Sequence, residues 1–350
     1  MIQKTDLPIS YDDVRLAWQH VGPHLEPTPL RRYPLLDELV GGTVFVKHEN
    51  LQPTHAFKVR NAFSALGQLA PDARRRGVIA ATRGNHGLGL CYAGQALGIG
   101  VTICVPHGNN PEKNAAIRSF GARLFEQGRD YDETLEFTKA LAAREGLHTV
   151  HSTNDRTVIA GAGTLTDEIL AQLTASALGG DELARVRSGR AAPGPMEKPL
   201  PLDLLVVAVG GGSQAVGALT ILAERMPELE VWGVQAANAP AQQKSWEAGR
   251  NVTTESADTI ADGLATRTSY ELTRPALRAG LSRFLLVSEA ELRNAIRVFL
   301  DTARTLSEPA GAAGLAGLLQ CQGELRGRRV AVILSGANID RATLGAALAE

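Results

Sequence analysis

Short apolar runs rich in β-branched residues alternate with longer stretches of helical spacing along most of the chain. The apolar runs predict strands at Val44–Val46, Val78–Ala81, Val101–Val105, Leu204–Val209, Val231–Val234, Phe284–Val287 and Val330–Leu334. The segments between them, such as Tyr131–Arg144 and Glu289–Thr305, carry apolar residues at the spacing of a helix that packs on a core. This alternation predicts an α/β fold with open, mainly parallel sheets wrapped by helices.

Several of the predicted strands run directly into glycine-containing clusters. These clusters are Thr82–Gly84, Gly210–Gly212 and Ser335–Gly336. In open α/β sheets, ligands bind at the carboxyl ends of the strands. The sequence therefore predicts a binding site where these three clusters meet.

The stretch 175–198 interrupts the alternation. It is rich in Gly, Pro, Arg and Ala and shows no clear period. We interpret it as a surface insertion, and a mobile loop without a role is the favoured reading. A lid or a subunit contact is the alternative.

Charge and cysteine content narrow the class of protein. Lys plus Arg (36) nearly balance Asp plus Glu (37), so no overall field attracts nucleic acid or an anionic membrane. The three cysteines are widely scattered, which argues against a disulfide framework or a zinc site. The polar amino end and the absence of a long apolar run predict a cytoplasmic protein.

Lys58 is the first candidate for chemistry, because it lies among Ala56, Phe57 and Val59. Apolar surroundings lower the pKa of an amine, since desolvation disfavours the ammonium form. The neutral amine is a nucleophile for a carbonyl carbon. The competing interpretation is a solvated lysine at the start of a helix.

Two glycine loops and one hydroxyl complete the local signals. The segment Gly84-Asn85-His86 precedes an apolar helix, whose first amides suit a carboxylate. The segment 210–213, Gly-Gly-Gly-Ser, suits a phosphate and matches neither a dinucleotide fingerprint nor a Walker loop. Ser335 ends a predicted strand, where its hydroxyl suits a ring nitrogen. Ordinary turns and a helix cap are the alternatives for these segments.

Taken together and in this order, the segments resemble the fold-type II pyridoxal phosphate enzymes. The nearest group is that of the threonine/serine dehydratases (ammonia-lyases) and serine racemases, and the resemblance runs from about residue 25 to 340. It implies two open, mainly parallel sheets as in the tryptophan synthase β subunit. It also implies a large domain, 1–70 and 154–350, a small mobile domain, 71–153, and a homodimer.

The resemblance also assigns roles to particular residues. Lys58 becomes the Schiff-base lysine and the main acid and base of catalysis. The residues expected to bind pyridoxal 5'-phosphate are Lys58, Phe57, Asn85, Gly210, Gly211, Gly212, Ser213 and Ser335. The residues expected to bind the substrate are Thr82, Arg83, Gly84, Asn85 and His86.

The implied reaction is α,β-elimination from a 3-hydroxy amino acid, such as threonine, serine or the bulkier phenylserine, to a 2-keto acid and ammonia. Dehydration of hydroxyaspartate, racemisation and β-replacement are alternatives within the same fold, and a pyridoxal-binding protein without turnover is a further class.

Three kinds of departure from the family pattern bear on these alternatives. Arg83 replaces the hydroxyl of racemases, which disfavours racemisation. Its side chain either offers a partner for a second carboxylate or an aryl group, or points to solvent or to a domain partner. Gln235 and Ala241 stand where metal-stimulated members carry acidic ligands, so we expect no metal. His55 and Ala56 replace a glycine and a serine beside the lysine.

Overall fold

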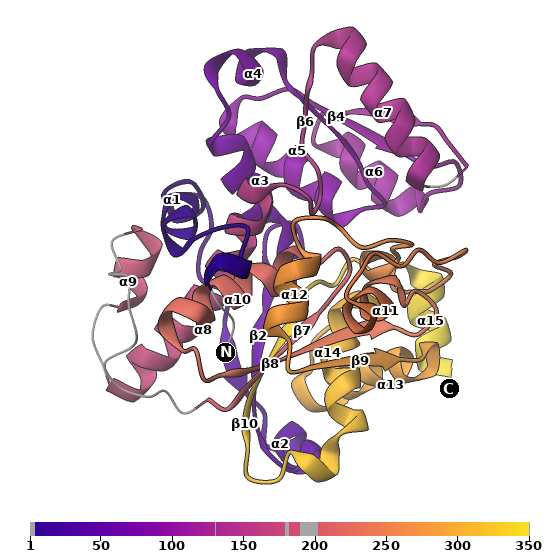
Figure 1. Ribbon diagram of the computed structural model, residues 1–350. Coiled ribbons are helices and arrows are strands. Elements are labelled where there is room, and N and C mark those ends of the chain that lie inside the picture. The colour runs from indigo at the N-terminus through magenta and orange to yellow at the C-terminus, as the bar shows by residue number, and fades with distance from the viewer. Residues whose placement is uncertain (1–3, 130, 179–181, 190–201, 350) are drawn as a thin grey trace.

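The computed structural model describes residues 4–129, 131–178, 182–189 and 202–349, and it contains two separate sheets (Figure 1). The larger sheet has the order β1 (Leu30–Arg32), β2 (Thr43–His48), β10 (Arg329–Leu334), β7 (Leu204–Ala208), β8 (Glu230–Ala236) and β9 (Arg283–Val287). The smaller sheet has the order β5 (Arg123–Glu126), β4 (Val101–Val105), β3 (Val78–Ala81) and β6 (His148–Thr149). Among the strands of the described residues, the β1–β2 pair alone is antiparallel, so the predicted fold class is confirmed.

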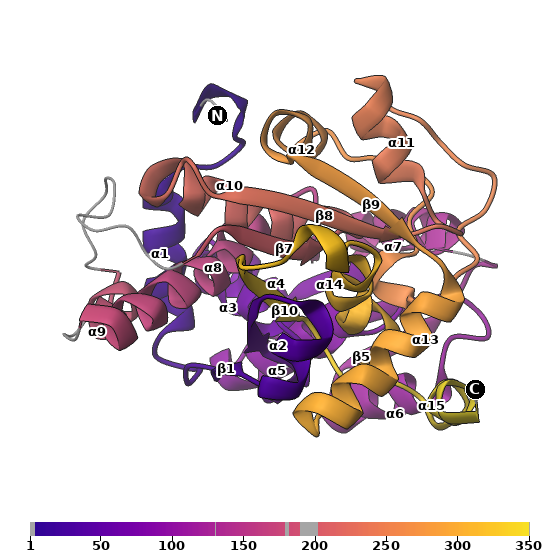
Figure 2. The same ribbon diagram turned by 90° about the horizontal axis from the view of Figure 1, so that it is seen from below.

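Alternating side chains of the larger sheet supply two separate cores. On β7, Leu205 and Val207 belong to a core with α1 (Tyr11–Val21), α3 (Lys58–Gly67), α5 (Asn85–Leu97), α8 (Arg156–Leu178), α10 (Ser213–Arg225) and α12 (Arg274–Gly280). Leu204 and Val206 belong to a core with α2 (Pro34–Val40), α13 (Glu289–Val298) and α14 (Pro309–Gln320). Helices thus cover both faces, as a mainly parallel sheet requires. Figure 2 shows this sheet from below, with α2 and α13 in front.

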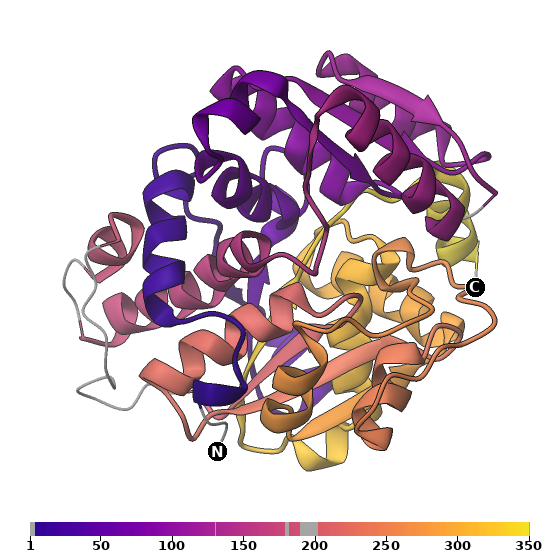
Figure 3. The ribbon, with the colours of Figure 1, turned by 45° about the horizontal axis from the view of Figure 1, so that its top comes forward.

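The smaller sheet forms the upper part of the molecule in Figures 1 and 3. Helix α7 (Tyr131–Glu145) packs on β3 and β4, and α6 (Pro111–Ser119) packs on β5. The other short helices are η1 (Lys4–Asp6), η2 (Glu49–Leu51), α4 (Pro71–Arg76), α11 (Ala241–Ala248), η3 (Asp262–Leu264), η5 (Gln322–Glu324) and α15 (Arg341–Ala349). Among the described residues, no helix combines the length and apolar character needed to cross a bilayer.

Two predicted segments differ from the observed ones. The stretch 175–198 is helical over much of its described part: α8 continues to Leu178, and α9 (Glu182–Arg187) packs on α1. Arg187 donates to the carbonyl oxygen of Gly22 at 3.1 Å, which fixes α9 to the amino-terminal segment. Residues 190–198 of the same stretch lie outside the described residues. The irregular insertion expected there is therefore wrong for α9, because its buried Val186 has a partner surface that the local sequence does not reveal.

The second difference concerns the helix predicted over Glu289–Thr305. The α-helix ends at Val298 and continues as a π-helical turn, η4 (Phe299–Ala303). The Thr302 hydroxyl donates to the carbonyl oxygen of Val298 at 2.6 Å, within this widened turn. Arg304 then takes a left-handed φ of 51°, which stops the helix.

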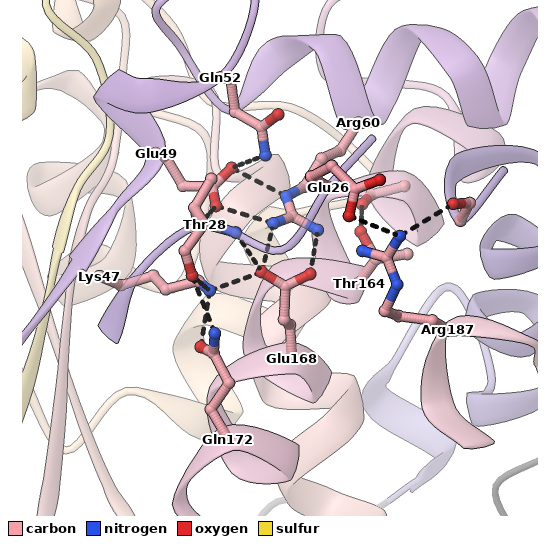
Figure 4. A network of polar contacts seen from close by, with 12 residues as sticks. Glu26, Thr28, Lys47, Glu49, Gln52, Arg60, Thr164, Glu168, Gln172 and Arg187 are labelled. Carbon is pink, nitrogen blue, oxygen red and sulfur yellow. Dashed lines mark hydrogen bonds and ion pairs between the residues drawn. The ribbon is translucent and has the colours of Figure 1, made fainter. Parts of the chain in front are cut away.

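A buried network of charged side chains joins β2, η2, α3 and α8 (Figure 4). Arg60 donates to both carboxylate oxygens of Glu49 at 2.8 Å, and to Glu168 at 2.8 and 3.2 Å. Lys47 donates to Glu168 at 2.5 Å and to the carbonyl oxygen of Thr28 at 2.8 Å. The two cations and two carboxylates balance, so their burial leaves no net charge in the interior.

The network also sets the charge state of its own members. Burial opposes ionisation of Glu168, but Arg60 and Lys47 outweigh it and hold the pKa of this carboxyl below its usual range. Gln52 donates to Glu49 at 3.2 Å and thereby satisfies a further oxygen lone pair. The first turn of α3 is therefore fixed to the sheet by bonds that cannot be exchanged for water without large cost.

We predict that Glu168→Gln lowers the free energy of unfolding by about 3–5 kcal/mol, because it leaves a buried cation without a partner. Urea denaturation measures this loss. Since the folded-state pKa of Glu168 is depressed, its contribution is complete above the ordinary pKa of 4.5 and is lost as the pH falls further. The difference between wild type and variant should therefore shrink in acid. Glu324→Gln, in the exposed pair with Arg283, is the control and should change stability little.

Candidate active site

A cavity of about 440 Å³ lies between the two sheets, at the carboxyl ends of their strands. Its walls include all of the residues that the sequence singled out for chemistry. These are Phe57, Lys58, Thr82, Arg83, Gly84, Asn85, His86, Gly210, Gly211, Gly212, Ser213 and Ser335. Segments that are far apart in the sequence therefore meet at one place, and the volume is typical of a small-molecule site.

The segment before α3 is held against the end of β10. Phe57 donates its amide to the carbonyl oxygen of Ser335 at 3.0 Å, and Ala337 donates to His55 at 2.9 Å. Ala56 and Gly336 form an antiparallel bridge between these bonds. His55 has a left-handed φ of 55°, a conformation that favours glycine, so the tight turn is kept here at some conformational cost. These contacts place Lys58 beside Ser335.

Lys58 is the first residue of α3, and its amine points into the cavity. The Nζ atom donates to the carbonyl oxygen of Ser152 at 3.0 Å and to the hydroxyl of Ser213 at 3.2 Å. The described residues form no ion pair with this amine. Burial therefore lowers the pKa of Lys58 to about 8, and about a tenth of the amine is neutral at pH 7.

The glycine loop between β7 and α10 is shaped for close approach. A side chain at Gly210 would strike the backbone of Gly263, and one at Gly211 would strike Thr153. Gly212 has a φ of 101° and precedes the first turn of α10, which begins at Ser213. The backbone amides of such a turn face outward at the positive end of a helix dipole, where they suit a phosphate.

A second loop, Thr82–His86, joins β3 to α5 on the opposite wall. The Thr82 hydroxyl accepts the amide of Gly84 at 3.0 Å and shapes the turn. The ring of His86 contacts the carbonyl oxygen of Val150 at 3.2 Å, and burial lowers its pKa to about 3, so the ring is neutral at physiological pH. The helix start offers a second place for an anion.

Arg83 on this loop carries a cation at the cavity wall. Its buried Nε atom has no hydrogen-bond partner among the described residues. A buried donor without a partner is costly, and a ligand with an acceptor would relieve that cost.

Sequence reasoning missed a polar cluster beside Asn85. Asn85 donates to Glu308 at 2.5 Å and accepts from Asn338 at 2.8 Å. Lys113, from α6, pairs with Asp262 at 2.6 Å, and both line the cavity. Glu308 precedes Pro309, and this sequence pattern is typical of an ordinary helix start. No local signal connects it with a loop 223 residues away.

The residues present fit pyridoxal phosphate. A weakly basic lysine, an anion-binding glycine turn and the strand-end serine Ser335 surround one cavity of suitable size. Among the described residues, no group of three or more His, Cys, Asp or Glu side chains is arranged as metal ligands. The fold and the site thus define a pyridoxal phosphate enzyme.

Comparison with known proteins identifies the family. Residues 21–336 match the family described as pyridoxal-phosphate dependent enzyme, and the chain belongs to it. The chain is 32% identical to L-threonine ammonia-lyase of Thermotoga maritima, over 95% of its own length and 76% of that protein. It is also 32% identical to L-threo-3-hydroxyaspartate ammonia-lyase of a Pseudomonas species, over 95% and 96% of the two chains. The predicted family and cofactor are confirmed.

The solved structures agree with this assignment. The chain superimposes on the threonine deaminase of T.th. with a TM-score of 0.83 and 32% sequence identity, and the match covers 95% of this chain and 99% of the other. These relatives are ammonia-lyases of hydroxy amino acids, which is the class of reaction that the sequence predicted.

We predict that the cofactor-free protein takes up pyridoxal phosphate faster as the pH rises, with half of the maximal rate near pH 8 and a plateau above about pH 9. The neutral Lys58 amine is the reactive form, and its pKa of about 8 sets the plateau. Stopped-flow absorbance measures the rate. A rate that still rises about tenfold between pH 8 and pH 9 would show that Lys58 has the ordinary pKa of 10.5 and that its burial has no effect.

Proposed function

We propose that this protein removes ammonia from a 3-hydroxy amino acid by α,β-elimination, with Lys58 as the base that takes the Cα proton. The observation that carries the proposal is the placement of this amine. It lies in the cavity with a pKa of about 8, between Ser152 and Ser213. A general base works best when its pKa lies near the working pH.

The other residues of the site bind and orient the cofactor and the substrate. With pyridoxal phosphate bound, the turn 210–213 would hold the phosphate, Asn85 would contact the 3-oxygen, Ser335 would bond the pyridine nitrogen, and Phe57 would lie beside the ring. Pyridoxal phosphate, when bound, supplies the electron sink that stabilises negative charge at Cα. Amides of the Thr82–His86 loop hold the substrate carboxylate at the start of α5. The overall products are a 2-keto acid and ammonia.

Arg83 favours one substrate among the candidates. Its buried Nε atom lacks a partner among the described residues, and it lies on the loop assigned to the substrate carboxylate. A side-chain carboxylate, as in 3-hydroxyaspartate, would provide that partner. A relative of 32% identity is named L-threo-3-hydroxyaspartate ammonia-lyase. Threonine, serine and phenylserine offer no second anion.

We predict keto acid release from at least one of threonine, serine, 3-hydroxyaspartate and phenylserine, and none from Lys58→Ala with any of them. A coupled assay of keto acid and a separate assay of ammonia measure the two products. The highest kcat/KM for 3-hydroxyaspartate would support the role given to Arg83. A wild-type protein that binds pyridoxal phosphate and releases no keto acid from these four would refute the elimination.

We further propose a homodimer. Four of the six exposed large apolar side chains in the described part lie on neighbouring segments: Leu35 and Leu39 on α2, Leu51 on η2, and Leu306. Helix α2 contacts the π-helical turn η4, and Asn50 donates to the carbonyl oxygen of Leu306 at 3.1 Å. A second copy would remove this apolar surface from water.

We also propose a cytoplasmic location and a division into two domains. All three cysteines lie in the described part, are buried and are free, which suits a reducing compartment such as the cytoplasm. The division into a large domain, 1–70 and 154–350, and a small mobile domain, 71–153, is supported by the position of β3–β6 within the latter range.

We predict that the purified protein sediments as a dimer and that Leu35→Glu together with Leu39→Glu converts it to a monomer. Charge at the buried centre of an interface opposes association. Sedimentation velocity measures the change. Leu348→Glu on α15, an equally exposed leucine away from this surface, is the control. A dimer that survives the double substitution would place the interface elsewhere.

A further inference from the structure

The side chain of Asn85 is held from both sides by residues of the larger-sheet part of the molecule. Asn338 donates at 2.9 Å to the carbonyl oxygen of Thr54, which can only accept. The same Asn338 nitrogen donates to the Asn85 side-chain oxygen at 2.8 Å. The Asn85 nitrogen must therefore face Glu308, which accepts from it at 2.5 Å. One fixed acceptor determines the direction of the whole chain of hydrogen bonds.

The charge on Glu308 strengthens this orientation of Asn85, because a hydrogen bond to an ionised acceptor is stronger than one to a neutral acceptor. A protonated carboxyl can donate to an amide oxygen, and this would favour the flipped form of Asn85. The flipped amide would set its nitrogen against the Asn338 nitrogen, with two donors facing one another. An ionised Glu308 and the donor Asn338 together permit one orientation.

Burial works against this ionised form. Glu308 is 5% exposed, and its amide bonds the carbonyl oxygen of Gly336 at 3.0 Å, so the residue cannot withdraw toward water. Burial raises the pKa of Glu308, and Asp262 on η3 raises it further. Lys113 and the Asn85 amide oppose the rise. Lys113 lines the same small hollow as this carboxylate.

Lys113 comes from the other side of the cavity. It belongs to α6, beside the smaller sheet, and its side chain passes against Gly84, where an added side chain would touch the Lys113 Cδ atom at 2.8 Å. Its partners come from the larger-sheet part: Asp262 at 2.6 Å, with Glu308 and Asp340 also acting on its charge. Lys113 thus pairs directly with Asp262 and lines the same small hollow as Glu308 and Asp340.

We propose that Lys113 is a positioning residue: its charge keeps Glu308 ionised, and Glu308 then holds the Asn85 amide in one orientation toward the cavity. This inference rests on the proposed function, because Asn85 matters through its contact with the cofactor. It assigns to the α6 lysine a role in the site without contact with the substrate. The competing explanation is a plain ion pair that fastens α6 to Asp262.

The charge of Glu308 is tested directly, without cofactor or substrate. Infrared spectra of wild type, Lys113→Met and Glu308→Gln at pH 7 identify a protonated Glu308 by a carboxylic-acid stretch that is absent in Glu308→Gln. We expect no such band in wild type and a clear one in Lys113→Met. A carboxyl that is protonated in both proteins, or ionised in both, would overturn the proposal even if the enzyme proves to be an ammonia-lyase.

The consequence for Asn85 is tested by the dissociation rate of pyridoxal phosphate from the loaded protein, followed in the visible spectrum. Lys113→Met should speed release about tenfold, the cost of one buried charge-assisted hydrogen bond, and Lys113→Arg should restore it. In the Glu308→Gln background the same Lys113→Met change should alter the release rate less than about twofold. The neutral amide of Gln accepts the hydrogen bond from Asn85 whether or not a cation lies nearby.

Two further variants distinguish the proposed positioning role from a plain ion pair. Lys139→Met removes the exposed ion pair between Lys139 and Glu136 on α7, in the same part of the molecule, and serves as the matched control. Asp262→Asn removes the ion pair and leaves Glu308 in place. If Asp262→Asn reproduces the effect of Lys113→Met, or if Lys113→Met costs as much with Gln at position 308 as with Glu, the lysine is only a fastening between α6 and η3.

Discussion

The buried pairing of Arg60 with Glu49 and Glu168 is the constraint on which the site depends. Arg60 belongs to the same first turn of α3 as Lys58, so the helix that carries the amine is anchored by its charged neighbour rather than by apolar packing alone. Ion pairs tolerate little displacement in a low-dielectric interior, because a lost partner leaves an uncompensated charge. The amine of Lys58, whose pKa is lowered by burial, thus projects from a helical turn that separate, paired charges hold in place.

The cavity has backbone hydrogen-bond donors at both ends and the amine of Lys58 between them. On the larger-sheet side, a glycine turn and a helix start present backbone donors, and on the smaller-sheet side a second helix start does the same. Between them stands one amine without a counter-ion among the described residues. Anionic groups at either end of a ligand are therefore attracted by amides, while the chemistry between them falls to a group whose charge varies near neutral pH.

Most of the fold could be predicted from the sequence because buried parallel strands are continuous apolar runs. The strands β1, β5 and β6 were missed, since they are short, polar and partly exposed, as in Leu30–Arg32. The site loops were readable because glycines and strand ends are local signals. The partners of Asn85 were not, since Glu308 and Asn338 become its neighbours only through the tertiary fold. The same reason hid α9, whose packing surface lies on α1.

The position of β10 between β2 and β7 has a consequence for biosynthesis. The ribosome releases β2 and Lys58 long before β10, the strand that pairs with β2 in parallel, and before Ser335, whose carbonyl oxygen fixes Phe57. Until then an apolar strand edge remains open to other chains. A nascent chain should thus lack the complete site until β10 has been made, and should need protection by chaperones during that interval.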